Sequence, residues 1–153
     1  ANQHFTTCKE RLSPFGVRVA LLSRFKSKKD QIETINEFSG QRHEKDDACL
    51  DVMILQRKND PTELWHHHPI WCQWIITDDG KHLMWDGGEK FYDYQYWLQY
   101  LINKYFVSWG RKLNGTLTYI GECKTQMGLI EVDDNHIILK QAKVTFQKDK
   151  LIC

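Results

Sequence analysis

The first half of the chain shows two strand-like patterns with one helical pattern between them. Residues 17–25, VRVALLSRF, are rich in apolar and β-branched side chains, which predicts a mostly buried strand. Ser27 and Asp30 then have the spacing of a helix capping box, and apolar residues recur at helical spacing over residues 28–39. Residues 49–57, CLDVMILQR, are apolar again and predict a second strand after a polar loop.

The next apolar stretch predicts a β-hairpin with a defined register. Asp79-Gly80 suits a two-residue type I′ turn, which needs positive φ at both positions. That turn places Trp74 opposite Trp85 across the two strands. One face of the hairpin is then apolar and is expected to join the core: Cys72, Trp74, Ile76, Leu83 and Trp85. The other face is polar: Gln73, Thr77, His82 and Asp86.

The stretch before Gly110 has the strongest helical pattern in the chain. Asp93 could cap this helix at its start, and Gly110 could end it. One stripe of apolar side chains recurs at helical spacing: Phe91, Tyr94, Leu98, Leu101, Ile102, Tyr105 and Trp109. Trp97, Tyr100 and Phe106 extend the apolar surface beyond that stripe. Such a helix is either enclosed within the fold or presents one face to a partner.

The C-terminal part of the chain returns to strand patterns. Residues 116–122 and 128–132 predict two strands, and a third begins at His136. A turn centred on Asp134-Asn135 fixes the register of the last two strands, in which Val132 pairs with Ile137 and Ile130 with Leu139. We expect about the first 12 and about the last six residues to fray, because termini without packing partners are poorly ordered.

The predicted order of elements is therefore β-α-β-ββ-α-β-ββ. Runs of strands interrupted by two helices indicate an α+β fold with a mainly antiparallel sheet of about six to seven strands. The chain has no internal repeat and no linker rich in Pro, Gly or Ser, so residues 1–153 are interpreted as a single domain.

Composition places the protein in the ordinary globular class. Hydrophobic residues make up 41% of the chain, charged residues make up 27%, and the net charge is +1 at pH 7. No strong field therefore draws the chain to nucleic acid or to an anionic membrane. No apolar run approaches the roughly 20 residues of a membrane helix, and the N-terminus lacks the apolar core of a signal peptide. The five cysteines are scattered, which favours reduced thiols in the cytoplasm or nucleus over a secreted disulfide framework.

One short stretch, WHHHPIWC, raises the question of metal binding. His66 and His68 lie two residues apart, so on a strand both imidazoles would share one face and could bind zinc with a third ligand. Four other residues could supply that ligand: Cys72, His82, Glu131 and His136. Pro69 interrupts a regular strand, and an H-x-H pair alone is a common chance pattern. A metal-dependent enzyme at His66 and His68 stays open as an alternative, with zinc as its cofactor.

Other catalytic arrangements have weaker support. Cys72 is the best candidate for a nucleophile because His68 and His82 lie near it in sequence, but a small buried apolar residue is the favoured explanation. The aspartates occur mainly at expected turns, where their side chains bond to nearby amides. We therefore expect no catalytic activity.

Two binding functions remain. The cations that could contact the backbone of single-stranded RNA are Lys28, Lys29, Arg111 and Lys112. No RNP1-like sequence accompanies them. The aromatic residues that could contact a protein, including a second copy of this chain, are Trp97, Tyr100 and Phe106. The sequence favours a non-catalytic macromolecule-binding or regulatory domain with a protein partner, and RNA binding is the alternative.

Overall fold

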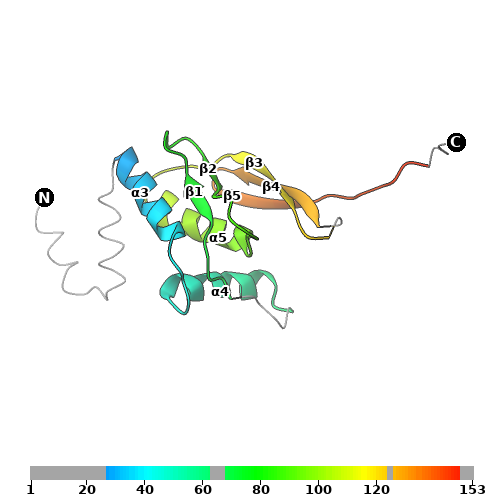
Figure 1. Ribbon diagram of the computed structural model, residues 1–153, viewed down its shortest axis with the longest axis horizontal. Coiled ribbons are helices and arrows are strands. Elements are labelled where there is room, and N and C mark those ends of the chain that lie inside the picture. Colours follow the sequence, from blue (N-terminus) through cyan, green and yellow to red (C-terminus); the bar gives the residue numbers. More distant parts are fainter. Residues whose placement is uncertain (1–26, 63–67, 124–125, 149–153) are drawn as a thin grey trace, which may run out of the picture. The chain divides into compact units, whose positions relative to one another are not determined.

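The computed structural model describes residues 27–62, 68–123 and 126–148 of the chain (Figure 1). The protein divides into two compact units, Ala1–Arg111 and Lys112–Cys153, here called unit 1 and unit 2. The strand predicted for residues 17–25 lies outside the described residues.

The α+β class is confirmed, and its details differ from the prediction. Unit 1 contains α3 (Lys28–Ser39), α4 (Asp47–Asn59), β1 (Trp74–Ile76), β2 (Leu83–Trp85), α5 (Tyr94–Leu101) and the π-helix η1 (Ile102–Phe106). Unit 2 contains β3 (Gly115–Ile120), β4 (Met127–Asp133) and β5 (His136–Gln141). Over the described ranges there are thus three α-helices rather than two, and five strands in two small antiparallel sheets rather than one sheet of six or seven.

Helix α3 forms where the sequence predicts it. The Ser27 hydroxyl accepts a hydrogen bond from the Asp30 amide at 3.1 Å, which satisfies one of the unpaired amides of the first turn. At the other end, the Gly40 amide donates to the Asn36 carbonyl. Helix α3 buries one stripe of side chains: Gln31, Ile35, Phe38 and Ser39.

Helix α4 corrects the prediction of a strand at residues 49–57. Asp46 caps the helix, since its carboxylate accepts from the Cys49 amide at 2.8 Å. Its buried positions recur at helical spacing: Ala48, Cys49, Val52 and Gln56. Leu50 and Ile54 are exposed on the opposite side. Because apolar side chains occur on both sides of this helix, its sequence reads as a continuous apolar run and the helical period is hidden.

The β1–β2 hairpin has the predicted register. Trp74 pairs with Trp85, and Ile76 pairs with Leu83. The predicted type I′ turn is wrong, because of its two central residues only Gly80 has positive φ, at +65°. Instead, the Gly80 amide donates to the Thr77 carbonyl at 2.7 Å and closes a turn over residues 77–80. The register is kept because the Thr77 amide donates to the His82 carbonyl at 2.9 Å, so the loop over residues 78–81 is still centred on Asp79-Gly80.

Side chains of α3 satisfy the backbone of β1 on the side away from β2. The Asn36 side-chain amide donates to the Ile76 carbonyl at 3.0 Å and accepts from the Ile76 amide at 2.8 Å. The Ser39 hydroxyl donates to the Trp74 carbonyl. Helix α3 thus takes the place of a third strand for this short hairpin, which explains how three-residue strands persist here.

The core of unit 1 is an aromatic cluster centred on Phe38. Its ring centroid lies 4.2 Å from that of His43, 5.6 Å from Tyr100 and 5.8 Å from Trp97. His43 is buried with both ring nitrogens bonded, one to the Asp46 carboxylate and the other to the Phe38 carbonyl, each at 2.8 Å. This histidine therefore ties the end of α3 to the start of α4.

Unit 2 is a three-stranded antiparallel meander in the order β3-β4-β5. The predicted register is confirmed, with Val132 opposite Ile137 and Ile130 opposite Leu139. Asp134 and Asn135 have φ of 48° and 69°, so the β4–β5 connection is the two-residue turn with positive φ at both positions. One face of the sheet is apolar: Leu117, Tyr119, Ile130, Val132, Ile137 and Leu139.

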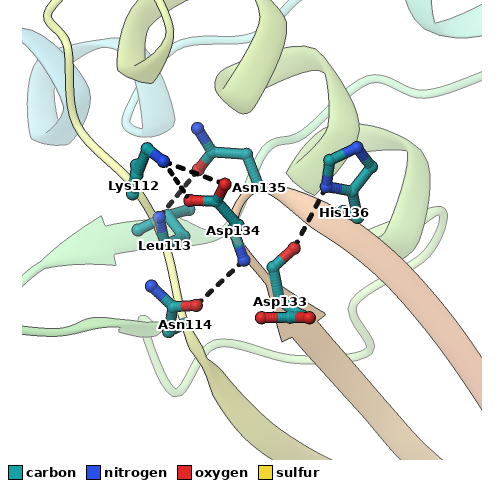
Figure 2. Close-up of polar contacts among 7 residues, drawn as sticks. All are labelled: Lys112, Leu113, Asn114, Asp133, Asp134, Asn135 and His136. Atoms are coloured by element: carbon teal, nitrogen blue, oxygen red, sulfur yellow. Dashed lines mark hydrogen bonds and ion pairs between the residues drawn. The ribbon is translucent and has the colours of Figure 1, made fainter.

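A set of polar contacts holds the β4–β5 turn against the segment that leads into β3 (Figure 2). The Asn135 side chain accepts from the Leu113 amide at 2.7 Å, and the Asn135 amide donates to the Leu113 carbonyl at 3.1 Å. Asn114 accepts from the Asp134 amide at 2.9 Å. The Lys112 ammonium lies 2.8 and 2.9 Å from the two Asp134 carboxylate oxygens. We call these contacts the turn clasp.

Candidate functional site

The most distinctive exposed feature of unit 1 is a set of large side chains on the β1–β2 hairpin. They are called the hairpin surface: Trp71, Gln73, Ile75, Met84 and Trp85. Trp71 is 47% exposed, Met84 46% and Trp85 46%. Tryptophan is a residue that folding usually buries deeply, so two half-exposed indoles on one short hairpin stand out.

Strand geometry brings these side chains together. Residues 71, 73 and 75 point to one side of the extended chain because side chains alternate along a strand. Met84 pairs with Ile75, which adds it to the same side. Trp85 belongs to the opposite side by alternation, but its indole N–H donates to the Gln73 side-chain oxygen at 2.7 Å. Trp85 therefore reaches around the edge of the hairpin, and the prediction that it joins the core is wrong.

The hairpin surface rests on a packed layer. Cys72, Trp74 and Ile76 alternate with the exposed residues and are buried. The Trp74 indole N–H donates to the Tyr94 carbonyl at 2.9 Å, and its ring makes an edge contact with Phe91 at a centroid distance of 5.2 Å. These contacts join the hairpin to the start of α5. The exposed indoles are thus held on a rigid support.

Gln73 organises the polar part of the surface. Besides accepting from Trp85, its amide group donates to the Lys90 carbonyl at 3.4 Å. Its backbone carbonyl accepts from the Asp86 amide at 2.9 Å. Arg42 forms an isolated antiparallel bridge with Trp71 and an ion pair with Glu44 at 3.0 Å. The indoles are therefore surrounded by polar groups that are already paired within the unit.

The hairpin segment contains more acidic than basic side chains. Residues 71–86 contain Asp78, Asp79 and Asp86 against Lys81. The Thr77 hydroxyl donates to the Asp79 carboxylate at 2.6 Å, and the Lys81 amide donates to it at 3.0 Å. These hydrogen bonds lower the pKa of Asp79 below its usual value. The carboxylate at the tip of the hairpin is accordingly ionised near neutral pH.

The aromatic residues expected to contact a partner lie in the core instead. Trp97, Tyr100 and Phe106 have exposed fractions of 0%, 6% and 5%. Trp97 and Tyr100 pack around Phe38 of α3. The helix is thus enclosed by its own unit, and a contact surface has to be made by other residues. Asp93 occupies the position before α5, but its side chain makes no capping hydrogen bond.

Each of the four predicted cations contacts a residue of its own unit. The Lys28 side chain lies against Gly80, where an added Cβ would come within 2.3 Å of its Cε atom. Lys29 forms an exposed ion pair with Glu33. Arg111 donates to the Gln31 side chain at 3.1 Å. Lys112 belongs to the turn clasp of unit 2.

The structure describes only part of the candidate metal and thiol sites. His66 lies outside the described residues. His68 is exposed and lines a cavity of about 110 Å³ with Glu44, Lys45, Cys49 and Ile70. That volume is below the roughly 300 Å³ at which ligand pockets begin. Among the described side chains, no group of three or more His, Cys, Asp or Glu residues is placed to hold a metal ion.

Cys72 is chemically unsuited to nucleophilic attack. It is fully buried, and the Ser39 hydroxyl lies 3.6 Å from its sulfur. Burial raises the pKa of the Cys72 thiol to about 11, because an apolar surrounding disfavours the thiolate. At neutral pH the side chain is therefore a neutral thiol that fills space beside α3.

Comparisons of this chain with protein-family models, with curated proteins and with solved structures give no match. Within the described ranges, none of the helices is long and apolar enough to span a membrane. The functional assignment consequently rests on the geometry of the chain itself.

Trp71 and Met84 are the residues that sequence reasoning missed. The register that placed Gln73 on the outer face also places Trp71 there, two residues earlier, and Met84 opposite Ile75. The signal was therefore available in the hairpin pattern. The predicted polar face named Gln73 and His82 on this side of the hairpin and left Trp71, Ile75 and Met84 unassigned.

Proposed function

We propose that the protein is a non-catalytic domain that binds another protein through the hairpin surface. The observation that supports this most directly is the pair of half-exposed indoles, Trp71 and Trp85, beside the half-exposed Met84. Tryptophan and methionine are enriched at protein interfaces, and tryptophan is one of the residues that most often dominates binding energy. A rigid support lowers the entropy lost on binding.

The local charge favours a protein over a nucleic acid. The three aspartates and single lysine of residues 71–86 give the hairpin a negative charge, which repels phosphate. Of the cations considered for RNA binding, Lys29 and Lys112 are paired with acidic groups. A partner with basic side chains around an apolar pocket would match both the indoles and the aspartates.

A comparative pull-down tests the proposal. The wild-type chain, the variant Trp71→Gln with Met84→Gln, and the control Val107→Gln are each used as bait in a native lysate, and bound proteins are quantified. Val107 is 57% exposed in the same unit but does not belong to the hairpin surface. We expect a discrete protein to be retained by the wild type and by the control and to be lost from the double variant.

Two results would count against this function. One is a bound protein whose recovery is the same for all three baits, because the hairpin surface would then make no contribution. The other is salt-dependent binding of single-stranded oligonucleotides that Lys28→Glu and Lys29→Glu weaken, which is what the RNA alternative predicts.

A further inference from the structure

The seven residues after β5 continue as an extended segment with the residue pattern of a strand (Figure 1). In residues 142–148, AKVTFQK, small or apolar side chains alternate with polar ones. The Ala142 amide donates to the Met127 carbonyl at 2.8 Å, and the described structure has no backbone hydrogen bond beyond it in this segment. Phe146 is 91% exposed. We call residues 142–148 the arm.

The sheet of unit 2 has one unprotected edge. β3 pairs with β4 on one side, and its other side has no strand partner in the described part of the chain. Residues 115–120, GTLTYI, include no charged residue and no proline, which are the usual devices against strand addition. The opposite edge strand, β5, carries His136 and Lys140. The outer edge of β3 is therefore the better acceptor for an added strand.

The arm cannot reach this edge within its own sheet. The arm continues the line of β5, and a strand added at the outer edge of β3 would lie three strand spacings from that line, about 14 Å. A return along β5 would need a turn directly after Gln141. Residues 142–148 contain no Gly, Pro, Asn or Asp to form one.

We propose that the arm of one copy pairs with the outer edge of β3 in a second copy, and that the exchange is reciprocal about a two-fold axis. Both the arm and the outer edge of β3 belong to this chain. In a pair of copies, the arm of each copy can therefore pair with the β3 edge of the other. An antiparallel register that places Thr145 opposite Thr118 also produces two favourable cross-strand pairs: Val144 with Tyr119, and Phe146 with Leu117.

The size of such an exchange fits a stable dimer. Each arm of seven residues is about 23 Å long when extended. Counting both arms and both edges, the exchange would bury on the order of 1,200 Å², which is the lower end for specific interfaces. The exchange uses unit 2 and not the hairpin surface, so it holds or fails independently of the proposed function.

The oligomeric state of the full chain tests the inference. We expect light scattering after size-exclusion chromatography to give twice the mass of one chain for the wild type at tens of micromolar. Thr145→Pro removes an amide donor from the middle of each arm and should raise the Kd of the dimer on the order of 100-fold. Thr145→Val, which keeps strand propensity, should leave the dimer unchanged.

A second variant tests the edge of β3 separately from the arm. Thr118→Lys places a charge on the edge of β3 and should also give a monomer, with an unchanged circular dichroism spectrum. Mixed with Thr145→Pro, it should form a heterodimer, because one intact arm and one intact edge remain. A monomeric wild type, a dimer that Thr145→Pro leaves intact, or a mixture that stays monomeric would each overturn the inference.

Discussion

Asn36 shows how a single side chain can connect a helix to a strand. Its amide group donates to the carbonyl of Ile76 and accepts from the amide of the same residue, as a neighbouring strand would. An unsatisfied buried backbone group costs roughly 1 to 3 kcal/mol, so Asn36 contributes to stability beyond its own packing.

Replacing Asn36 should therefore destabilise the protein more than its partial burial suggests. We expect Asn36→Ala to lower the free energy of unfolding by about 2 kcal/mol, because both bonds to Ile76 are lost. Asn36→Asp keeps the acceptor but sets a carboxylate oxygen against the Ile76 carbonyl, so it should destabilise the protein by a similar amount. Urea unfolding followed by tryptophan fluorescence measures these differences.

The neighbouring position supplies the control for this change. Glu37 is exposed on the same helix, and Glu37→Ala should alter stability by no more than about 0.5 kcal/mol. Equal stabilities for Asn36→Ala and Glu37→Ala would show that the Asn36 amide does not support β1.

Because Cys72 is buried, its thiol reactivity and its contribution to the stability of the protein should both depend on pH. Its pKa is raised from 9.0 to about 11, so at pH 9 only about 1% is thiolate in the folded protein, against half for an ordinary thiol. The neutral thiol stabilises the fold fully below pH 9, and this contribution is lost as the pH rises through about 11. The stability lost over this pH range is about 2 to 3 kcal/mol in total.

Alkylation and unfolding measure the two consequences. At pH 9, iodoacetamide should label the exposed Cys123 at least roughly 50-fold faster than Cys72 in the folded protein, and at similar rates in urea. Cys72→Ala should show a shallower loss of stability between pH 9 and 11 than the wild type. Rapid labelling of Cys72 without unfolding would contradict the burial that raises its pKa.

At the scale of elements, the turn clasp fixes the β4–β5 connection through Asn135. This residue tolerates positive φ, and its side chain also accepts from the Leu113 amide. We expect Asn135→Ala to lower the stability of unit 2 by about 2 kcal/mol, because alanine is strained at positive φ and lacks the acceptor. Thermal unfolding followed by far-UV circular dichroism measures the change.

Asn135→Gly separates the two causes. Glycine adopts positive φ without strain but cannot accept the hydrogen bond from Leu113. An intermediate loss of about 1 kcal/mol is expected if the clasp contributes. Stability equal to or above that of the wild type would mean that only the backbone conformation of this turn matters.

Local signals made some elements predictable from sequence. The cap at Ser27, the turn at Asp79-Gly80 and the turn at Asp134-Asn135 lie next to the residues whose placement they determine. A turn sets a register because side chains alternate along a strand, so an error in turn type does not change the pairing. The helix α3 and both registers follow from such short-range rules.

Helix α4 and the burial of the α5 aromatics could not be predicted in the same way. Leu50 and Ile54 are apolar but exposed, and this hides the helical period of α4. Trp97 and Tyr100 are buried because Phe38, about 60 residues earlier in the chain, packs against them. Which apolar face becomes part of the core depends on such long-range contacts, and these cannot be predicted from composition alone.

At the scale of the whole molecule, the two units present two different kinds of contact surface. Unit 1 exposes aromatic side chains on the β1–β2 hairpin. Unit 2 exposes strand edges and the arm. The first kind suits a partner with an apolar pocket, and the second suits backbone pairing. Substitutions in one unit should accordingly leave the contacts of the other unchanged.

Isothermal titration with the captured protein, produced in pure form, tests most directly whether the hairpin surface binds a protein. We predict that Trp71→Ala raises the Kd at least roughly 30-fold, as expected for a dominant interface tryptophan, while Val107→Ala changes it less than about twofold. A Kd for Trp71→Ala within about twofold of the wild type would contradict the claim.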